Sequence, residues 1–228
     1  MENLNKPKKI WNPVWDIVYQ NHDWGKYPSE SLIQFIARNF YRRERSKTKI
    51  LEIGCGPAPN IWYLAREGFD AYGIDGSKIA IEKGKMRLAQ EGLSANLIVG
   101  DIIKLPFENN FFDGVVDVEC LYCMNISNTE IILQEVARVL KPYGLFYSRT
   151  FSTNFFIGDK PDSISKYEYL NVYEGPQANR GFIRLIDKQE IHRLYGKYFN
   201  VLSVDQLIST RDNEKIKISE WIIISKKK

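Results

Sequence analysis

Short apolar runs alternate with amphipathic segments through the middle of the chain. Five runs rich in Ile, Val, Leu and aromatic residues have the length of buried strands, and they lie at 50–53, 71–74, 97–99, 112–118 and 145–148. Between them, apolar side chains recur every three or four residues, which is the spacing of helices that pack one face on a core. Strands that alternate with helices in this way are typical of α/β proteins built around a parallel sheet.

Polar residues mark where several helices begin. Asn60 can cap a helix after the first strand, Ser77 one that ends near Gln90, and Asp187 a short one over 188–195. Residues 199–204 and 221–224 then supply two last strands. The chain is therefore predicted to be one domain, 1–228, with its core at 48–150 and a final helix and strands at 188–228.

Residues 1–47 are expected to form a helical lid. Trp15 and Tyr19 are four residues apart, with Trp11 behind them, so they fall on one helical face. The polar and aromatic stretch 22–28 follows, and another helix begins at Ser29. Such an aromatic stripe either packs on the domain or covers a ligand, and both interpretations stay open at this point.

The regular alternation ends after residue 150. The segment 151–187 contains glycines and prolines together with many aromatic residues. Long loops in compact domains are usually functional or disordered, and disordered segments rarely carry so many aromatic side chains. We interpret the segment as a loop insert that covers the substrate, with a structural packing insert as the alternative.

The sequence Glu52-Ile53-Gly54-Cys55-Gly56 joins the first strand to the first helix. Glycine has no Cβ, so a ligand can approach the backbone there and meet the N–H groups that begin the helix. Asp75 ends the second apolar run about 20 residues further on, where a carboxylate can accept both hydroxyls of a ribose. Together these features predict a ligand that contains a ribose.

These residues resemble the class I S-adenosylmethionine-dependent methyltransferase family. The resemblance starts at Glu52-x-Gly54-x-Gly56 and continues through Gly73-Ile74-Asp75, Gly100-Asp101-Ile102, Leu105-Pro106-Phe107, Phe112-Asp113-Gly114-Val115-Val116 and Leu140-Lys141-Pro142-Tyr143-Gly144. It covers roughly residues 48–151 closely, and the third glycine of the usual motif is Ala58 here. It implies a Rossmann-like, doubly wound fold with a seven-stranded, mostly parallel sheet whose last strand is antiparallel.

The resemblance also implies S-adenosyl-L-methionine as the cofactor. The loop 52–56 would hold its methionine end, Asp75 the ribose, Asp101 and Ile102 the adenine, and the backbone at 117–119 the sulfonium side. Small methyltransferases often place an N-terminal aromatic segment against the cofactor. The expected cofactor-binding residues are therefore Tyr19, Trp24, Lys26, Glu52, Gly54, Cys55, Gly56, Asp75, Gly76, Asp101, Ile102, Asp117 and Val118.

Methyl transfer from a sulfonium depends chiefly on positioning, because the leaving group departs neutral and a general base is optional. Glu119 and Tyr122, at the exit of the fourth strand, and His192 are the candidate catalytic residues; His22 is the other histidine. We expect transfer to an oxygen or nitrogen of a small-molecule acceptor. The alternatives are an RNA or protein methyltransferase, or a catalytically silent S-adenosylmethionine-binding protein.

The net charge, the cysteines and the length of the apolar runs limit the kinds of partner that the protein is expected to have. A net charge of +4, from 32 basic and 28 acidic residues, is too balanced to favour nucleic acid. Cys120-x-x-Cys123 lacks a second pair or a histidine cluster, so no metal is expected. No run is long enough to span a membrane, and residues 1–6 lack the apolar core of a signal peptide, so a cytoplasmic protein is predicted. We expect a monomer or homodimer.

Two rival enzymes fit the motifs less well. A nicotinamide-dependent oxidoreductase also needs a glycine loop, but Glu52 would repel a pyrophosphate and the glycine spacing differs. Methyltransferases of adenine amino groups carry an Asn/Asp-Pro-Pro-aromatic motif where this chain has Asp117-Val118-Glu119-Cys120.

The acceptor itself is not legible in the sequence. The aromatic residues of the cover favour a planar or apolar group. The cations near it favour an acidic or phosphorylated acceptor, and they are Arg149, Lys160, Lys166, Arg180 and Arg184. A raised Michaelis constant for an anionic acceptor in Arg184→Ala, at fixed cofactor affinity, would support the acidic acceptor, and an unchanged constant would exclude it.

Overall fold

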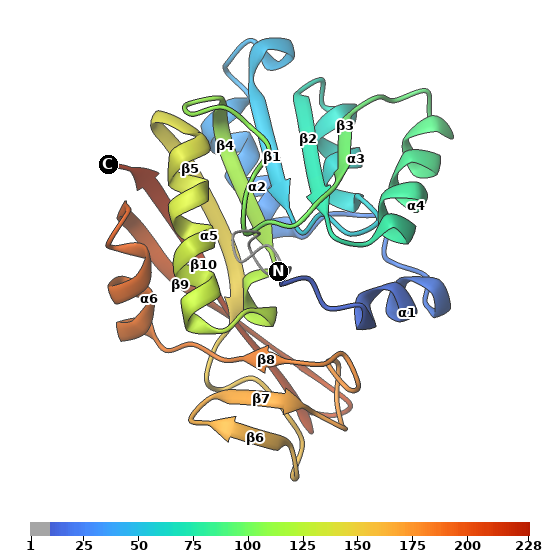
Figure 1. Ribbon diagram of the computed structural model, residues 1–228, viewed down its shortest axis with the longest axis vertical. Coiled ribbons are helices and arrows are strands. Elements are labelled where there is room, and N and C mark those ends of the chain that lie inside the picture. Colours follow the sequence, from blue (N-terminus) through green and yellow to red (C-terminus); the bar gives the residue numbers. More distant parts are fainter. Residues whose placement is uncertain (1–9) are drawn as a thin grey trace, which may run out of the picture.

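The computed structural model describes residues 10–228 as a twisted sheet with helices on both faces (Figure 1). Residues 1–6, considered above as a possible signal peptide, lie outside the described residues. The main sheet has seven strands in the order β3-β2-β1-β4-β5-β10-β9. Their bounds are β1 Lys49–Ile53, β2 Asp70–Asp75, β3 Asn96–Val99, β4 Phe112–Val118, β5 Leu140–Phe151, β9 Phe199–Arg211 and β10 Ile216–Lys227.

The direction of the strands confirms the predicted fold class. β1 pairs in parallel with β2 and β4, and the pairs β2–β3 and β4–β5 are also parallel. β10 runs antiparallel to both β5 and β9. The strand order changes direction between β1 and β4, and ligands of open α/β sheets bind at the carboxyl ends of the strands at such a point.

Alternating residues of the strands build two cores. Leu51 and Ile53 point to one face of the sheet, where α5 and α6 pack, and Ile50 points to the opposite face, covered by α2, α3 and α4. The helices are α1 Val14–Asn21, α2 Glu30–Phe40, α3 Pro59–Arg66, α4 Lys78–Ala89, α5 Ile126–Val139 and α6 Lys188–Tyr195. Short 3-10 turns lie at η1 Arg45–Lys47 and η2 Leu121–Cys123.

Two of the three predicted helix caps are confirmed. The Ser77 hydroxyl accepts from the N–H of Ala80 at 3.1 Å, and the Asp187 carboxylate accepts from the N–H of Glu190 at 2.8 Å. The prediction for Asn60 was wrong, because α3 begins at Pro59, two residues earlier than predicted, and its N-cap is Ala58, in the left-handed conformation with φ of 59°. Outside glycine this conformation costs roughly 1–2 kcal/mol, so the residue that replaces the third glycine of the motif carries backbone strain.

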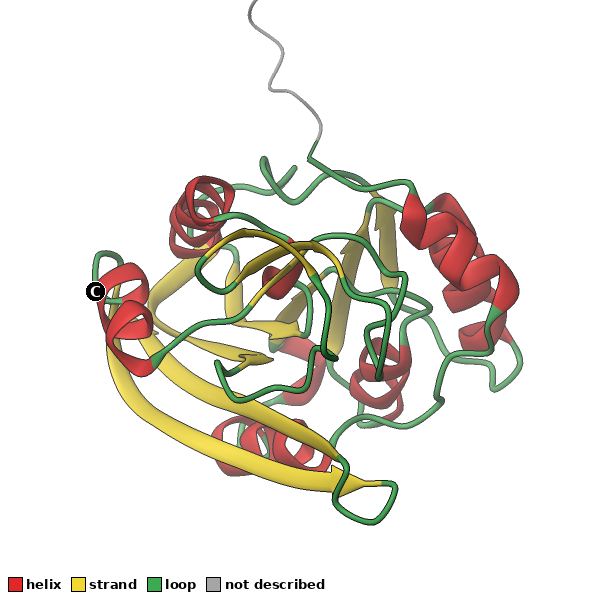
Figure 2. Cartoon of the chain, turned by 90° about the horizontal axis from the view of Figure 1, so that it is seen from below, coloured by secondary structure: helices red, strands yellow, loops and turns green. Residues whose placement is uncertain are grey.

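The segment 151–187 contains a small sheet rather than loop alone. Its strands are β6 Asp162–Ser165, β7 Glu168–Asn171 and β8 Ile183–Arg184, in the order β6-β7-β8. Figure 2 shows this small sheet lying across the end of the main sheet, with the β9–β10 hairpin curving past it. Phe151, Phe155, Val172 and Ile183 pack with Tyr122 of η2 and join the small sheet to the main body.

Candidate functional site

A cavity of about 320 Å³ opens at the carboxyl ends of the central strands. Its walls come from the loops after β1, β2, β3 and β4, from α1 and the segment 24–29, and from the small-sheet segment. This is the size of small-molecule sites, which usually exceed about 300 Å³. The fold therefore brings segments that are far apart in sequence to one enclosed space at the switch point between β1 and β4.

The loop after β1 is fastened to the loop after β2. The N–H of Gly56 donates to Oδ2 of Asp75 at 2.9 Å, and the N–H of Ser77 donates to Oδ1 of the same residue at 2.8 Å. Gly54 and Gly56 have φ of 64° and 51°, which other residues rarely adopt. Burial raises the pKa of Asp75, and the two backbone N–H groups oppose that rise.

The protein's own side chains approach the glycines closely. A Cβ on Gly54 would lie 2.2 Å from Sγ of Cys120, and one on Gly56 would lie 2.9 Å from the hydroxyl oxygen of Tyr19. Glycine is thus required at both positions by packing as well as by backbone conformation.

Glu52 is a buried carboxylate with one oxygen free. Its Oε1 accepts from the Asn60 amide at 2.5 Å, whereas Oε2 has no hydrogen-bond partner within the described residues. Burial raises the pKa of Glu52 well above its usual range, although the Asn60 hydrogen bond opposes this. A buried acceptor without a donor is costly, and Glu52 lines the cavity, so this carboxylate is suited to a cationic partner.

Asp101 is bound by the N-terminal segment. Its Oδ2 accepts from the N–H groups of Ile10 at 2.7 Å and Trp11 at 3.2 Å, and its Oδ1 from Ile103 at 3.1 Å. The Trp11 ring packs so closely on Gly76 that a Cβ there would lie 2.0 Å from it. The indole Nε1 of Trp11 is buried and has no partner in the described part of the chain.

Three aromatic rings of the N-terminal segment form one cluster at the cavity. The ring of Tyr19 lies 5.7 Å from that of Trp15 and 5.2 Å from that of Trp24, measured between centroids. The guanidinium of Arg87 donates to the Trp24 carbonyl at 3.2 Å and the Gly25 carbonyl at 3.0 Å, which ties this segment to α4. The stripe predicted from sequence therefore borders the cavity.

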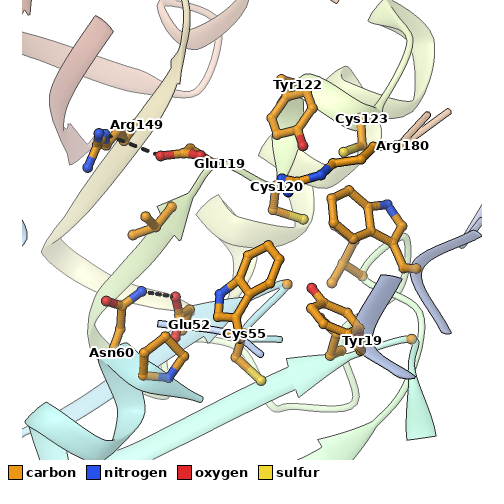
Figure 3. A pocket seen from close by; sticks show the side chains of 18 of the residues that line it. Tyr19, Glu52, Cys55, Asn60, Glu119, Cys120, Tyr122, Cys123, Arg149 and Arg180 are labelled. Atoms are coloured by element: carbon orange, nitrogen blue, oxygen red, sulfur yellow. Dashed lines mark hydrogen bonds and ion pairs between the residues drawn. The ribbon is translucent and has the colours of Figure 1, made fainter. Parts of the chain in front are cut away.

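The exit of β4 carries an ion-pair cluster. Arg149 of β5 donates to Glu220 of β10, with Nε and Oε1 2.8 Å apart, and lies 3.5 Å from the Glu119 carboxylate (Figure 3). Burial raises the pKa of Glu119 to about 7, against the opposing charge of Arg149. Its side chain still has 33% of its surface exposed and lines the cavity, so Glu119 is a carboxyl poised to exchange a proton near neutral pH.

Tyr122 joins the exit of β4 to the small-sheet segment. Its hydroxyl donates to Oε1 of Gln177 at 2.8 Å, and both side chains are buried. Cys120 and Cys123 are free thiols that line the same part of the cavity. Within residues 10–228, no three His, Cys, Asp or Glu side chains gather in a way that could hold a metal ion.

Most of the residues singled out from sequence lie together. Those that line the cavity are Tyr19, Trp24, Glu52, Gly54, Cys55, Asp75, Gly76, Asp101, Ile102, Val118, Glu119 and Tyr122. Gly56 lies just behind the wall, under the Tyr19 hydroxyl.

Besides Gly56, three residues from the same set do not line the cavity. The Lys26 ammonium turns to Glu91, 2.7 Å away. Asp117 is fully buried, and its carboxylate accepts from the N–H of Cys120 at 2.9 Å and from the Ser148 hydroxyl at 2.6 Å. His192 is exposed on α6, opposite its apolar face, so we leave His192, Lys26 and the Asp117 side chain out of the site proposed below.

Other lining residues were missed or misjudged from sequence. Asn60 was interpreted as a helix cap, and Gln177 carried no signal because it lies in an irregular segment. Trp11 was assigned to the aromatic stripe, but its indole lies on Gly76 instead. Arg149 and Arg180 were recognised only as cations near the cover, and both line the cavity.

Comparisons with known proteins agree with this geometry. Residues 50–144 match a family described as a methyltransferase domain. The chain is 29% identical over 150 residues to the uncharacterized methyltransferase YodH of Bacillus subtilis, covering 65% of this chain and 58% of that protein. It is 32% identical over 129 residues to a sterol 24-C-methyltransferase of Pneumocystis carinii, covering 52% of this chain and 33% of that protein.

A solved structure extends the likeness to the whole fold. The structure of a SAM-dependent methyltransferase from Methanosarcina mazei superposes with a TM-score of 0.72 at 22% identity. The match covers 88% of this chain and 98% of that one. No helix within residues 10–228 is both long and apolar enough to cross a membrane.

Proposed function

The chain belongs to the class I S-adenosylmethionine-dependent methyltransferase family, and on that premise we propose that it transfers a methyl group to an oxygen or nitrogen of a small-molecule acceptor. The observation that carries the proposal is the row of carboxylates Glu52, Asp75 and Asp101, which lie at the carboxyl ends of β1, β2 and β3 and line one cavity. The chain spans 58% and 33% of the two relatives compared above. Its activity and acceptor are therefore proposed from its own site.

The residues present fit S-adenosyl-L-methionine, the methyl donor of this family. The donor carries an ammonium and a sulfonium, and Glu52, which lines the cavity, has a carboxylate oxygen, Oε2, without a hydrogen-bond partner among residues 10–228. We assign Glu52 to the ammonium and Asp75 to the ribose hydroxyls. Asp101, Ile102 and the unpartnered indole N–H of Trp11 border the space assigned to the adenine.

Bound S-adenosylmethionine supplies an activated methyl group on a leaving group that departs neutral. The contribution of the protein is then to hold the acceptor in line and to exclude water, and such positioning alone can lower a barrier by about 7–11 kcal/mol. Val118 and Cys120 form the wall between the glycine loop and the small-sheet segment, and Tyr122, fixed by Gln177, closes the acceptor side.

Glu119 is the residue that we assign as general base. An acceptor hydroxyl or ammonium must lose a proton, and a carboxylate whose pKa is about 7 can take it near neutral pH. Arg149 lies 3.5 Å away and stabilises the ionised form that accepts the proton. Tyr122 is assigned to contact the acceptor.

The proposal of a small-molecule acceptor rests on the enclosed cavity and on one named relative. A cavity of about 320 Å³, covered by two segments of the chain, suits a small molecule better than a nucleic acid or a protein surface. The Pneumocystis carinii relative is named for a sterol, which is also a small molecule. A cytoplasmic location stays a prediction of the sequence.

Calorimetric titration with S-adenosylmethionine, S-adenosylhomocysteine and, separately, NAD⁺ tests the cofactor assignment. Micromolar binding of the two sulfur compounds and none of NAD⁺ supports the proposal. Binding of NAD⁺ alone, or of no compound to a folded sample, overturns it. Saturable binding with no turnover on any acceptor favours the catalytically silent alternative.

A further inference from the structure

The cavity has two chemically different ends. Glu52, Asp75 and Asp101 line the end at the glycine loop, which the proposed function assigns to the cationic cofactor. Within residues 10–228, the cations that line the cavity are Arg149 and Arg180, on β5 and on the small-sheet segment. The acceptor end therefore contains cations, which the cofactor end lacks among the described residues.

Arg149 already has its counter-ions. Its guanidinium donates through Nε to Glu220, which is 1% exposed, and also lies 3.5 Å from Glu119. Two carboxylates face one guanidinium, so this cluster has no positive charge left for a ligand. An anionic ligand placed here would meet net negative charge.

Arg180 has no such partner among residues 10–228, where no carboxylate lies within 4.0 Å of its guanidinium. The side chain is half-buried, and Figure 3 shows it extending into the cavity toward Tyr122 and Cys120. Burial raises the pKa of Tyr122 and the nearby charge of Arg180 opposes that rise, which agrees with their closeness.

The other cations considered from sequence lie elsewhere. Lys160 is exposed, and Lys166 and Arg184 line a separate hollow beside Glu190. Arg184 is buried, with its Nε donating to the Met124 carbonyl and its Nη2 to the Thr129 hydroxyl, both at 3.0 Å. The structure therefore singles out Arg180 from the five candidate cations.

The Arg180 guanidinium lies beside an aromatic ring of the N-terminal segment. Its guanidinium carbon lies 5.6 Å from the centroid of Trp24, whose ring meets that of Trp15 edge to face at 6.4 Å, and Phe182 lies two residues further along the chain. All of these side chains line the cavity. They offer faces on which a flat, apolar body can stack beside the guanidinium.

A second donor lies near Arg180. The Gln177 side chain is 5% exposed, and its Oε1 is held by the Tyr122 hydroxyl, which leaves the amide NH₂ group free to donate. The N–H of Arg180 lies 3.3 Å from the Gln177 carbonyl, so both residues belong to one turn.

We propose that the methyl acceptor carries a carboxylate on a planar, apolar body, and that Arg180 binds this carboxylate as its anchor. A guanidinium presents parallel N–H groups that match the two oxygens of a carboxylate, and Gln177 adds a neutral donor. A phosphate dianion would need more positive charge than one guanidinium supplies, because the charge of Arg149 is neutralised. This inference rests on the proposed function and specifies the acceptor of the same site.

Matched probes test it by calorimetry on protein saturated with S-adenosylhomocysteine. The probes are 2-naphthoate, the neutral 2-naphthamide and 2-naphthyl phosphate. We expect 2-naphthoate to bind at least tenfold more tightly than the other two, and Arg180→Gln to remove this preference. Arg180→Lys should keep part of the preference for 2-naphthoate, because an ammonium has the positive charge but not the parallel N–H groups of a guanidinium. Lys160→Gln, an exposed cation of the same segment, is the matched control and should change nothing.

The outcomes separate two kinds of failure. If the folded wild-type protein does not bind S-adenosylhomocysteine, the proposed function is overturned. When S-adenosylhomocysteine binds normally, three results overturn the acceptor assignment alone. They are no binding of 2-naphthoate, equally tight binding of the amide or the phosphate, and an unchanged 2-naphthoate affinity in Arg180→Gln. Because the cofactor affinity of Arg180→Gln should stay within twofold of wild type, the same titrations also show that the variant is folded.

Discussion

The backbone N–H of Gly56 donates to the carboxylate of Asp75 across 2.9 Å, so the two residues that the sequence assigns to one ligand also hold each other in place. This hydrogen bond links the loop after β1 to the end of β2, and the strands β1 and β2 pair in parallel. Any substitution at Asp75 therefore acts on the shape of the glycine loop as well as on the ligand.

Asp75→Asn should weaken S-adenosylmethionine binding at least tenfold, or about 1.4 kcal/mol. The Asp75 carboxylate already accepts from the N–H groups of Gly56 and Ser77 and would also accept from the ribose hydroxyls. An asparagine amide has one acceptor oxygen, and its NH₂ group would face one of these two backbone N–H groups, donor against donor. Calorimetry measures the change. Asp70→Asn, at the opposite end of β2, is the control, and an affinity of Asp75→Asn within twofold of wild type would refute the assignment.

Glu52→Gln should stabilise the ligand-free protein while it weakens cofactor binding. Burial raises the pKa of Glu52, so the folded state binds a proton more tightly than the unfolded state. Stability is then lost as the pH rises above the unfolded pKa of about 4.3. The glutamine removes this loss and keeps an acceptor for Asn60. We expect the Tm to rise by about 2–4 °C at pH 7.5 and to stay unchanged at pH 4; equal shifts at both values would contradict the account.

Glu119→Gln should remove the acid limb of the rate profile. The pKa of Glu119 is about 7, so a base at this position loses activity as the pH falls below 7. The variant should be slower by roughly 10² to 10⁴ at pH 8 and insensitive to pH in this range. The measurement is kcat for S-adenosylhomocysteine formation between pH 5.5 and 8.5 with an acceptor that turns over. A wild-type profile that is flat across pH 7 would exclude Glu119 as the base.

Gly76→Ala should weaken cofactor binding by displacing Trp11. An added Cβ would lie 2.0 Å from the Trp11 ring, so the ring must move, and with it the backbone that binds Asp101. We expect at least a tenfold loss of S-adenosylmethionine affinity. Gly25→Ala, which has nothing within 4 Å of an added Cβ and also lines the cavity, is the control. Equal affinities for the two variants would show that Trp11 is not part of the site.

Arg184→Ala should affect stability rather than the acceptor. Its guanidinium joins the small-sheet segment to the start of α5 through Met124 and Thr129, and Nη1 lies 3.6 Å from Glu190. Losing hydrogen bonds from a buried charged group costs about 1.5–3 kcal/mol. Urea denaturation should show this loss for Arg184→Ala but not for Arg193→Ala, whose side chain is 51% exposed. An unchanged urea midpoint together with a raised Michaelis constant would instead support Arg184 as a cation that binds an acidic acceptor, one of the alternatives left open by the sequence.

The sequence predicts the parts of the fold where one face of an element is buried. Strand β4, Phe112–Val118, appears with the predicted bounds because most of its residues are buried between the helices on both faces of the sheet. The β9–β10 hairpin, Phe199–Arg211 and Ile216–Lys227, is longer than the predicted 199–204 and 221–224. Residues 205–211 are exposed, so no apolar alternation marks them as strand.

Residues of the cofactor half of the candidate site were predictable from spacing, whereas in the acceptor half Glu119 and Tyr122 were predicted and Gln177 was not. Glu52, Gly54 and Asp75 lie at fixed distances from strand ends, so their spacing reveals them. Gln177 and Arg180 reach the cavity only because the small-sheet segment folds back over the carboxyl ends of the strands. Asn60 shows the converse error, since a residue suited to cap a helix turns instead to the Glu52 carboxylate.

The positions of the tryptophans make the intrinsic fluorescence of this protein sensitive to ligand binding. Of the five tryptophans, Trp11, Trp15 and Trp24 line the cavity. Trp62 lies in α3 and Trp221 in β10, where its indole N–H donates to the Ile186 carbonyl at 2.8 Å. The emission of the unlabelled chain should therefore respond when the cavity fills, with two fluorophores outside it as an internal reference, and the cofactor titrations described above can be followed by tryptophan fluorescence at micromolar protein.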